Sequence, residues 1–258
     1  MSHPPNEVIA LMLRHRSIRR YRPDPVPEED VRWILQSAQA ASTSSFLQAY
    51  TIIGVRNAEL RAELAALSNN AHVAEAPLFL VFLADLRRLS AAAARHGVAA
   101  RVETTEAFIV ATVDAALAAE NAAVAAESLG YGICYIGGLR NAVDAVSERL
   151  GLPEQVTPLF GMTVGRPAED PAPKPRLPLP VVYHEERYDI GRDAGLSAYD
   201  EVVRAYYRAR TGGRREDTYT GLVARTLAEP RRAHMAAYLR ARGFLRDQAT
   251  VKEPPAGR

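Results

Sequence analysis

The sequence predicts a fold that mixes α-helices with β-strands, and three observations support this. Short, nearly continuous apolar runs, typical of buried strands, recur through the first two-thirds of the chain. Stretches with apolar residues at helical spacing separate these runs. A proline-rich segment then leads to further amphipathic helices. The pattern indicates strands interleaved with helices and leaves the pairing direction of the strands open.

The expected elements follow in chain order. A short apolar helix covers 8–13, and a second helix begins after Pro27, because proline and acidic residues are favoured where a helix starts. An alanine-rich helix is expected over 105–129, ending at Gly130. The remaining expected elements are strands at 51–55, 78–84, 131–136 and 158–165 and helices at 59–67, 143–150, 199–208 and 220–245.

Proline recurs between residues 167 and 180 and forbids a regular helix or a central strand there. We therefore expect a core over 1–166, an extended arm with C-terminal helices over 167–248, and a frayed tail over 249–258. The arm either builds a subdomain on its own subunit or embraces a partner subunit. The alanine-rich helix favours the second, because small side chains let helices of two subunits approach closely.

Composition indicates a globular protein of a reducing compartment. The hydrophobic fraction of 48% and the charged fraction of 24% are ordinary for a soluble domain. A net charge of +2 gives no electrostatic case for nucleic acid or membrane as a partner. Cys134 is the only cysteine, so an intrachain disulfide is excluded. Because the apolar stretch 107–129 carries acidic residues, we expect a buried helix there, no membrane span and a cytoplasmic location.

Most standard catalytic patterns are missing from the chain. Its six histidines have no metal-ligand spacing, so we expect no metal site. The nucleophile elbow of hydrolases does not occur, and neither do the usual glycine-rich nucleotide loops. A ligand with a phosphate would therefore need a less common type of site.

Two short basic clusters lie far apart in the sequence, His15-Arg16-Ser17-Ile18-Arg19 and Lys174-Pro175-Arg176. If the fold brings them together they form a phosphate cradle, because arginine forks match phosphate oxygens in pairs and lysine adds a point charge. The alternative is a solvated basic edge. The pair Gly137-Gly138 follows a strand, so its backbone N–H groups can approach a planar ligand, although a plain turn explains the pair equally well.

Several motifs occur together in the order seen in the nitroreductase superfamily. They are His15-Arg16-Ser17-Ile18-Arg19, Ser44-Ser45-Phe46-Leu47-Gln48, Ala126-Glu127-Ser128-Leu129-Gly130, Tyr135-Ile136-Gly137-Gly138-Leu139-Arg140-Asn141, Pro158-Leu159-Phe160-Gly161 and Lys174-Pro175-Arg176-Leu177-Pro178. The chain most resembles oxygen-insensitive NADPH nitroreductases and related bacterial flavin reductases, over almost its whole length. The resemblance implies an α+β fold, with a central sheet flanked by helices and a C-terminal excursion. It also implies a homodimer that binds FMN at the subunit interface.

The resemblance further implies a set of binding residues. Those for FMN are His15, Arg16, Ser17 and Arg19, the distant Lys174 and Arg176, the strip Tyr135, Ile136, Gly137 and Gly138, and Ser42, Thr43 and Ser44 from the other subunit. Those for NADPH or substrate are Arg210, Arg214, Arg215 and Arg231. Close relatives use a glutamine just before the position of His72, in a loop that is one residue shorter here. Asn70 is the candidate replacement, and whether it makes that contact stays open.

The implied activity is that of an FMN-dependent NADPH oxidoreductase. Hydride passes from NADPH to flavin N5, and two electrons then pass to a nitroaromatic, a quinone or free flavin in a ping-pong cycle. One alternative is a flavin reductase that supplies reduced FMN to a monooxygenase, and another is a non-catalytic FMN sensor. The expected partners are small-molecule acceptors and a second copy of the chain. The loop at 210–215 either binds NADPH or is a mobile polar connection.

Overall fold

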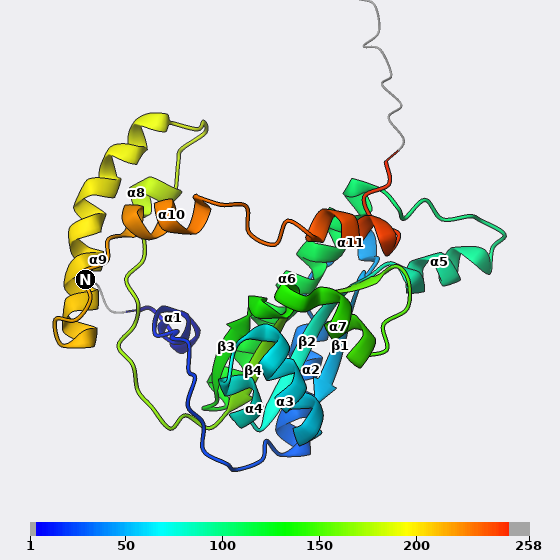
Figure 1. Cartoon of the computed structure of the whole chain (residues 1–258), viewed down its shortest axis with the longest axis horizontal. Coiled ribbons are helices and arrows are strands. Elements are labelled where there is room, and N and C mark those ends of the chain that lie inside the picture. The colour runs from blue at the N-terminus through cyan, green and yellow to red at the C-terminus, as the bar shows by residue number, and fades with distance from the viewer. Residues whose placement is uncertain (1–3, 248–258) are drawn as a thin grey trace, which may run out of the picture. The chain divides into compact units, whose positions relative to one another are not determined.

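The computed structural model describes residues 4–247 and divides into two compact units. Unit 1 runs to Asp170 and resumes at His234, while unit 2 comprises Pro171–Ala233. Figure 1 shows that unit 1 is built around a sheet and that unit 2 is built from helices. The tail expected at 249–258 lies outside the described residues.

Unit 1 rests on a four-stranded sheet with the strand order β1-β2-β4-β3. The strands are β1 (Tyr50–Val55), β2 (Leu78–Asp85), β3 (Gly132–Ile136) and β4 (Val156–Gly165). All three pairings are antiparallel, which settles the direction that the sequence left open. The expected strands are all present, and the fold is α+β.

The helices of unit 1 come mostly before the proline-rich segment. They are α1 (Glu7–Leu13), α2 (Glu28–Gln39), η1 (Ser44–Phe46), α3 (Ala58–Ser68), α4 (His72–Glu75), α5 (Arg87–Ala94), α6 (Thr105–Ser128), η2 (Gly137–Ala142), α7 (Val143–Arg149) and α11 (Met235–Ala241). The sequence predicted α1, α3, α6 and α7 to within about one residue at each end, and it predicted the start of α2 after Pro27. It missed α4 and α5, because such short helices show too little periodicity to be recognised.

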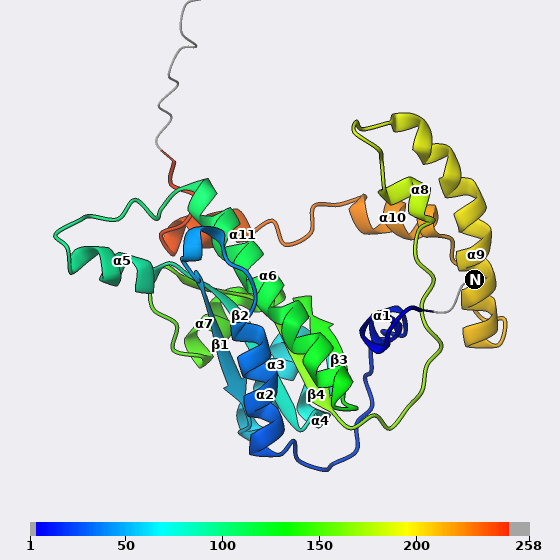
Figure 2. The same cartoon turned by 180° about the vertical axis from the view of Figure 1, so that it is seen from behind.

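Helices cover both faces of the sheet. Alternate residues of β2 point to opposite faces and so pack against different helices. Leu80 and Phe82 pack into one cluster with residues of α2 and α6, the helices in front of the sheet in Figure 2. Phe79 and Val81 pack into a second cluster with residues of α3, α4 and α7. Because β2 is buried along its entire length, it forms the centre of unit 1.

Helix α6 is long and apolar enough to cross a membrane by composition alone, with a mean hydropathy of 1.5 over its most apolar window. In the structure it packs against the sheet and α2, and its alanines at 111, 115, 118 and 122 are buried in the first cluster. Small side chains allow this close approach between the helix and the sheet. The expected burial is only partly met, because one face of the helix packs in the core while Ile109, Val113 and Leu117 on another face are exposed.

Unit 2 contains α8 (Leu179–Val182), η3 (Ile190–Gly195), α9 (Leu196–Thr211) and α10 (Tyr219–Leu227). Its small core is one face of α9, where Tyr199, Val203 and Tyr207 recur at helical spacing and are buried. Leu177 of the proline-rich segment packs against this face. The segment is thereby fixed to α9 within unit 2.

Two expectations for the C-terminal third are wrong. The single helix expected over 220–245 is replaced by α10 and α11, because Pro230 cannot continue a helix and Arg232 adopts a left-handed φ of 55°. The segment 167–180, expected to contain no helix, ends in α8, which has Pro180 in its first turn. Proline is tolerated there because the first N–H groups of a helix have no partner within the helix.

Candidate functional site

The basic stretch after α1 is anchored to the edge of the sheet at β3. Ser17 forms a parallel bridge with Ile133, and the Ile18 N–H donates to the Ile133 carbonyl at 2.8 Å. The Ile18 side chain is 2% exposed and packs over Gly132, where a Cβ would lie 2.5 Å from Ile18 Cγ1. Because successive side chains of an extended segment alternate, Ser17 and Arg19 are presented on the side opposite Ile18.

On that side, the charge of Arg19 acts on both Cys134 and His72, and Ser17 forms a hydrogen bond with Cys134. Burial raises the pKa of the Cys134 thiol, and the charge of Arg19 and a hydrogen bond with Ser17 oppose the rise. Burial lowers the pKa of His72, and Arg19 lowers it further. Nε2 of His72 is buried without a hydrogen-bond partner among residues 4–247. We call this group the cationic corner: it holds the positive charge of Arg19, which Glu169 and Glu75 offset in part, and the unused His72 nitrogen, and these two features suit an anionic ligand.

His15 and Arg16 contact acidic residues. Nδ1 of His15 lies 2.7 Å from Oε1 of Glu127 on α6, and the Arg16 guanidinium pairs with Asp170. Nε of Arg16 is buried and makes no hydrogen bond within the described part of the chain. Arg16 also lines two cavities, of about 250 and 750 Å³. It therefore has a donor left for a further anion.

The glycine strip follows β3 and packs against the loop before α4. A Cβ on Gly138 would fall well inside the contact distance of the Ser68 carbonyl oxygen and Nδ2 of Asn70, whereas a Cβ on Gly137 would meet only the Arg140 guanidinium, at 3.3 Å. Nδ2 of Asn70 donates to the Ser68 carbonyl at 2.6 Å. The structure thus brings Asn70, the candidate for the missing glutamine, next to Gly138.

Tyr135 and Ile136 of the same strip face opposite ways. Ile136 is buried in the second cluster, so only its backbone can reach a ligand. The Tyr135 hydroxyl donates to Oε2 of Glu120 at 3.3 Å, and its ring meets Phe160 edge-on at 5.7 Å between centroids. Burial raises the pKa of Tyr135, and the Glu120 carboxylate raises it further. The hydroxyl therefore stays protonated at physiological pH and remains a donor.

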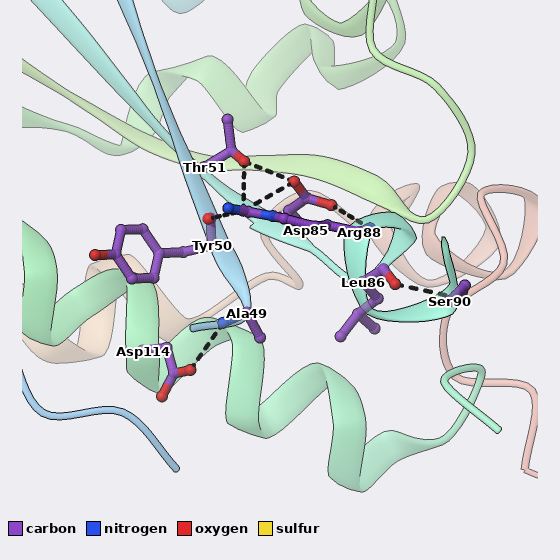
Figure 3. Close-up of polar contacts among 8 residues, drawn as sticks. All are labelled: Ala49, Tyr50, Thr51, Asp85, Leu86, Arg88, Ser90 and Asp114. Carbon is purple, nitrogen blue, oxygen red and sulfur yellow. Dashed lines mark hydrogen bonds and ion pairs between the residues drawn. The ribbon is translucent and has the colours of Figure 1, made fainter. Parts of the chain in front are cut away.

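The serine loop, residues 42–48, leads into β1 and has an unusual backbone. Ser45, Phe46 and Gln48 adopt left-handed φ values of 49°, 60° and 52°. The buried Asp114 of α6 accepts hydrogen bonds from the backbone of Ser44 and of Ala49, the latter shown in Figure 3. The three predicted residues Ser42, Thr43 and Ser44 therefore lie on a loop whose two ends are held by one carboxylate.

The second predicted basic cluster lies in unit 2, on the aromatic face of α9. Nζ of Lys174 is 5.9 Å from the centroid of the Tyr207 ring, and Cζ of Arg215 is 4.4 Å from the same centroid. The Tyr199 hydroxyl fixes the arm by donating to the Pro175 carbonyl at 2.9 Å. Arg176 is exposed. Lys174, predicted to bind the flavin phosphate, and Arg215, predicted to bind NADPH, thus both lie at the Tyr207 ring.

The arginine loop, residues 210–215, is exposed and held by weak contacts. Nη1 of Arg210 donates to the Tyr206 hydroxyl at 2.7 Å, and Nε of Arg214 donates to a backbone carbonyl. Arg215 pairs with Asp217 at 2.7 Å. Such exposed contacts contribute about 1 kcal/mol or less, so a phosphate can replace them. Arg231 is exposed at the end of unit 2.

Sequence reasoning missed several residues of this region. Asp114 and Glu127 carried a signal, because each is a carboxylate in an otherwise apolar helix. His72 carried none, and neither did Glu169, which accepts from the Arg19 N–H at 2.6 Å. Among residues 4–247, no group of three or more histidine, cysteine or acidic side chains is arranged to hold a metal ion.

The chain matches two family models. The model described as "Nitroreductase family" covers residues 12–166, and "Nitroreductase family, C-terminal domain" covers residues 174–247. An FMN reductase (NADPH) from Bacillus subtilis is 43% identical over 245 residues, which span 93% of this chain and 98% of the relative. The two family models together cover the core and the C-terminal part, and the B. subtilis relative matches across both.

Solved structures agree with these matches. The NfrA1 nitroreductase from B. subtilis superposes with a TM-score of 0.90 at 42% identity, covering 93% of this chain and 100% of that one. The NADPH:FMN oxidoreductase from Vibrio harveyi, complexed with NAD+, gives a TM-score of 0.86 at 38% identity and covers 94% and 100%. With the antiparallel sheet, the anchored basic stretch and the glycine strip, these matches establish that the chain is an oxidoreductase of the nitroreductase family.

Proposed function

We propose that this protein is an FMN-dependent NADPH oxidoreductase that reduces nitroaromatics, quinones or free flavin. The observation that carries the proposal is the cationic corner of unit 1, where the anchored basic stretch meets His72 beside the glycine strip. Relatives that cover nearly the whole chain are named for the same pair, NADPH and FMN.

The residues of the corner suit a flavin mononucleotide. A phosphate dianion needs donors and positive charge, and Arg16 and His72 each have a buried nitrogen that makes no hydrogen bond within residues 4–247. Lys174 and Arg176 are proposed as phosphate ligands on the sequence resemblance alone. We assign the backbone N–H groups of Gly137 and Gly138 to the planar ring, while the missing Cβ of Gly138 allows the close packing against Ser68 and Asn70.

When bound, FMN supplies the redox chemistry, accepting hydride from NADPH at N5 and giving two electrons to the acceptor. The chain's own residues bind and orient the flavin, the coenzyme and the acceptor. The positive charge of the exposed Arg19, near the half-buried His72, favours negative charge on a ligand. Tyr135 keeps its proton and donates it to Glu120, and this bond holds the ring at the edge of the strip. The arginine loop binds the coenzyme 2′-phosphate, and Arg231 lines the acceptor pocket.

We also propose a homodimer that works in the cytoplasm. One face of α6 exposes Ile109, Val113 and Leu117, each between 43% and 49% exposed, and the serine loop exposes Phe46. An apolar stripe at this helical spacing is typical of a subunit interface. In the dimer, Ser42, Thr43 and Ser44 serve the flavin of the other subunit. Sedimentation should find a dimer, and a monomer that retains its flavin would contradict this.

The proposed organisation keeps a core over 1–166, an arm with helices over 167–248 and a tail over 249–258. It is supported by the stretch 168–178, which carries four prolines and forms neither helix nor strand before α8 begins at Leu179. Limited proteolysis tests it, because cleavage should begin in the tail and in the proline-rich segment. First cleavage within the core would contradict the division.

The function is tested by a spectrum and a rapid-mixing experiment. The purified protein should be yellow with one FMN per subunit, and NADPH should bleach the bound flavin within turnover time. A protein that gains no flavin spectrum with added FMN would refute the proposal. Bound flavin that NADPH does not reduce would identify a sensor instead, and steady-state rates with a nitroaromatic against free FMN separate a nitroreductase from a dedicated flavin reductase.

A further inference from the structure

We propose that Asp114 is a positioning residue for the flavin site, because its carboxylate fixes the serine loop in the conformation that presents Ser44 and Phe46. The inference rests on the proposed function, in which this loop serves the flavin of the other subunit. Asp114 itself is buried in the core of unit 1 and does not touch the ligand.

The chemistry of Asp114 is that of a buried carboxylate satisfied by backbone donors. The residue is 0% exposed, and α6 is otherwise buried there through alanines. Its two oxygens accept from the N–H groups of Ser44 at 2.9 Å and Ala49 at 3.0 Å. Removing a carboxylate from water is costly, and a buried charge often yields less stability than an apolar side chain of similar size. A role in specifying the loop conformation accounts for its presence.

The serine loop needs such a constraint because its own backbone is disfavoured. Ser45, Phe46 and Gln48 are all left-handed, a conformation that L-residues other than glycine rarely adopt. Inside the loop, the Leu47 N–H donates to the Ser44 carbonyl at 2.9 Å, but the Phe46 N–H donates to Thr43 only at 3.4 Å. The two bonds to Asp114 therefore supply much of the order of the loop.

The same bonds decide which groups the loop can offer. Because the Ser44 N–H is engaged by Asp114, the exposed Ser44 side chain is left to meet a ligand. Phe46 lies at the tip of the loop and is 83% exposed. Asp114 also follows Val113 of the apolar stripe on α6. A single turn of α6 thus links the proposed subunit contact to the loop that reaches the partner's flavin.

Asp85, at the end of β2, provides a matched control. It is 9% exposed, accepts from Oγ1 of Thr51 at 2.6 Å, and contacts Arg88, as Figure 3 shows. Like Asp114, it is a buried carboxylate that accepts hydrogen bonds near the start of β1. It makes none to the serine loop, so its loss tests destabilisation without displacement of that loop.

The experiment compares the holoenzymes of Asp114→Asn and Asp85→Asn with the wild type. Asparagine has one acceptor oxygen, so Asp114→Asn leaves either the Ser44 or the Ala49 N–H group unpaired. FMN dissociation, followed by the recovery of flavin fluorescence, should accelerate about tenfold in Asp114→Asn, the change that one charge-assisted hydrogen bond accounts for. In Asp85→Asn it should stay within about twofold of the wild type even if both variants melt earlier. Equal FMN dissociation in Asp114→Asn and the wild type would overturn the proposal.

Amide hydrogen exchange on the wild-type chain keeps the inference testable if Asp114→Asn does not fold. The Ser44 and Ala49 amides should exchange far more slowly than other amides of the serine loop, with or without FMN. Exchange of both at the rate of an unstructured peptide would overturn the proposal. A wild type that binds no flavin but protects these two amides would refute the proposed function and leave the loop constraint established.

Discussion

The cationic corner of unit 1 and the arginine loop of unit 2 are both rich in positive charge, but they are held in different ways. In the corner, Ile18 is buried against β3, Arg19 lies beside a half-buried histidine, and the adjoining glycine strip packs on Asn70. In the loop, Arg210 and Arg215 are exposed: Arg210 contacts the half-buried Tyr206, and Arg215 pairs with Asp217 and lies over the ring of Tyr207.

The difference shows how one chain can keep one ligand and release another. A site whose groups are fixed by buried neighbours pays little ordering entropy when a ligand arrives, which favours a resident cofactor. An exposed loop with Gly212 and Gly213 in left-handed conformations can rearrange around a coenzyme that must leave after each turnover. Substitutions in the corner should therefore change folding and flavin content, while those in the loop should change only coenzyme kinetics.

The largest effect is expected from Gly138→Ala. The new Cβ would collide with the Ser68 backbone carbonyl and with Asn70, and backbone cannot move aside as a flexible side chain can. Thermal unfolding should show a loss of about 3 kcal/mol, together with loss of bound flavin. Gly137→Ala is the matched control, because its Cβ meets only the Arg140 side chain, and its cost should be about 1 kcal/mol or less. Equal melting of the two variants would show that the strip is not tightly packed.

Next in size is the loss of a phosphate ligand. Arg19→Ala or Arg176→Ala should weaken FMN binding by about 1.5 to 3 kcal/mol, the value of a charge-assisted hydrogen bond. Arg20→Ala is the control, since alternation along the extended segment turns that side chain away from the side of Arg19, and it should change binding by less than about 0.5 kcal/mol. Titration of the apoprotein with FMN measures all three. Unchanged FMN affinity in both Arg19→Ala and Arg176→Ala would show that these residues belong to a solvated basic edge and do not bind the phosphate.

A smaller and more selective effect is expected in the arginine loop. Arg210→Ala should raise the KM for NADPH about tenfold and the KM for NADH far less, because only NADPH carries the 2′-phosphate that arginine binds. Flavin content should not change. Arg208→Ala serves as the control, since that side chain forms an exposed ion pair with Glu216. If Arg210→Ala and a double substitution of Arg214 and Arg215 leave the NADPH/NADH ratio unchanged, coenzyme preference is set elsewhere.

The smallest effect concerns the pH dependence of stability through His72. Its pKa is lowered in the folded state by burial and by Arg19, so the unfolded chain binds the proton more readily. The free energy of unfolding should therefore fall as the pH drops below the unfolded value of about 6.5, and the contribution should be complete above it. His72→Asn should flatten this slope in melting curves between pH 7.5 and 5.5, while the exposed His96→Asn should not. A slope unaffected by His72→Asn would assign the dependence to other groups.

The sequence by itself determined the elements and most of the chemistry. Apolar runs placed the four strands because buried strands must be apolar on both faces, and helical periodicity placed α2, α3 and α6. The order of the motifs predicted the family, which the family models and solved structures confirm. Apolar runs, helical periodicity and motif order all depend on residues that are neighbours along the chain. A single sequence shows these neighbours directly.

Only the tertiary structure decided how distant groups combine. The antiparallel strand order, the burial of Ile18 over Gly132 and the meeting of Arg19 with His72 all join residues far apart in sequence, and periodicity carries no information about such contacts. The same holds for Asp114, whose carboxylate reaches backbone N–H groups that any residue type could provide. A hydrogen bond to a backbone N–H does not depend on the partner's residue type. The sequence therefore cannot reveal the constraint on the serine loop, and only the three-dimensional structure shows it.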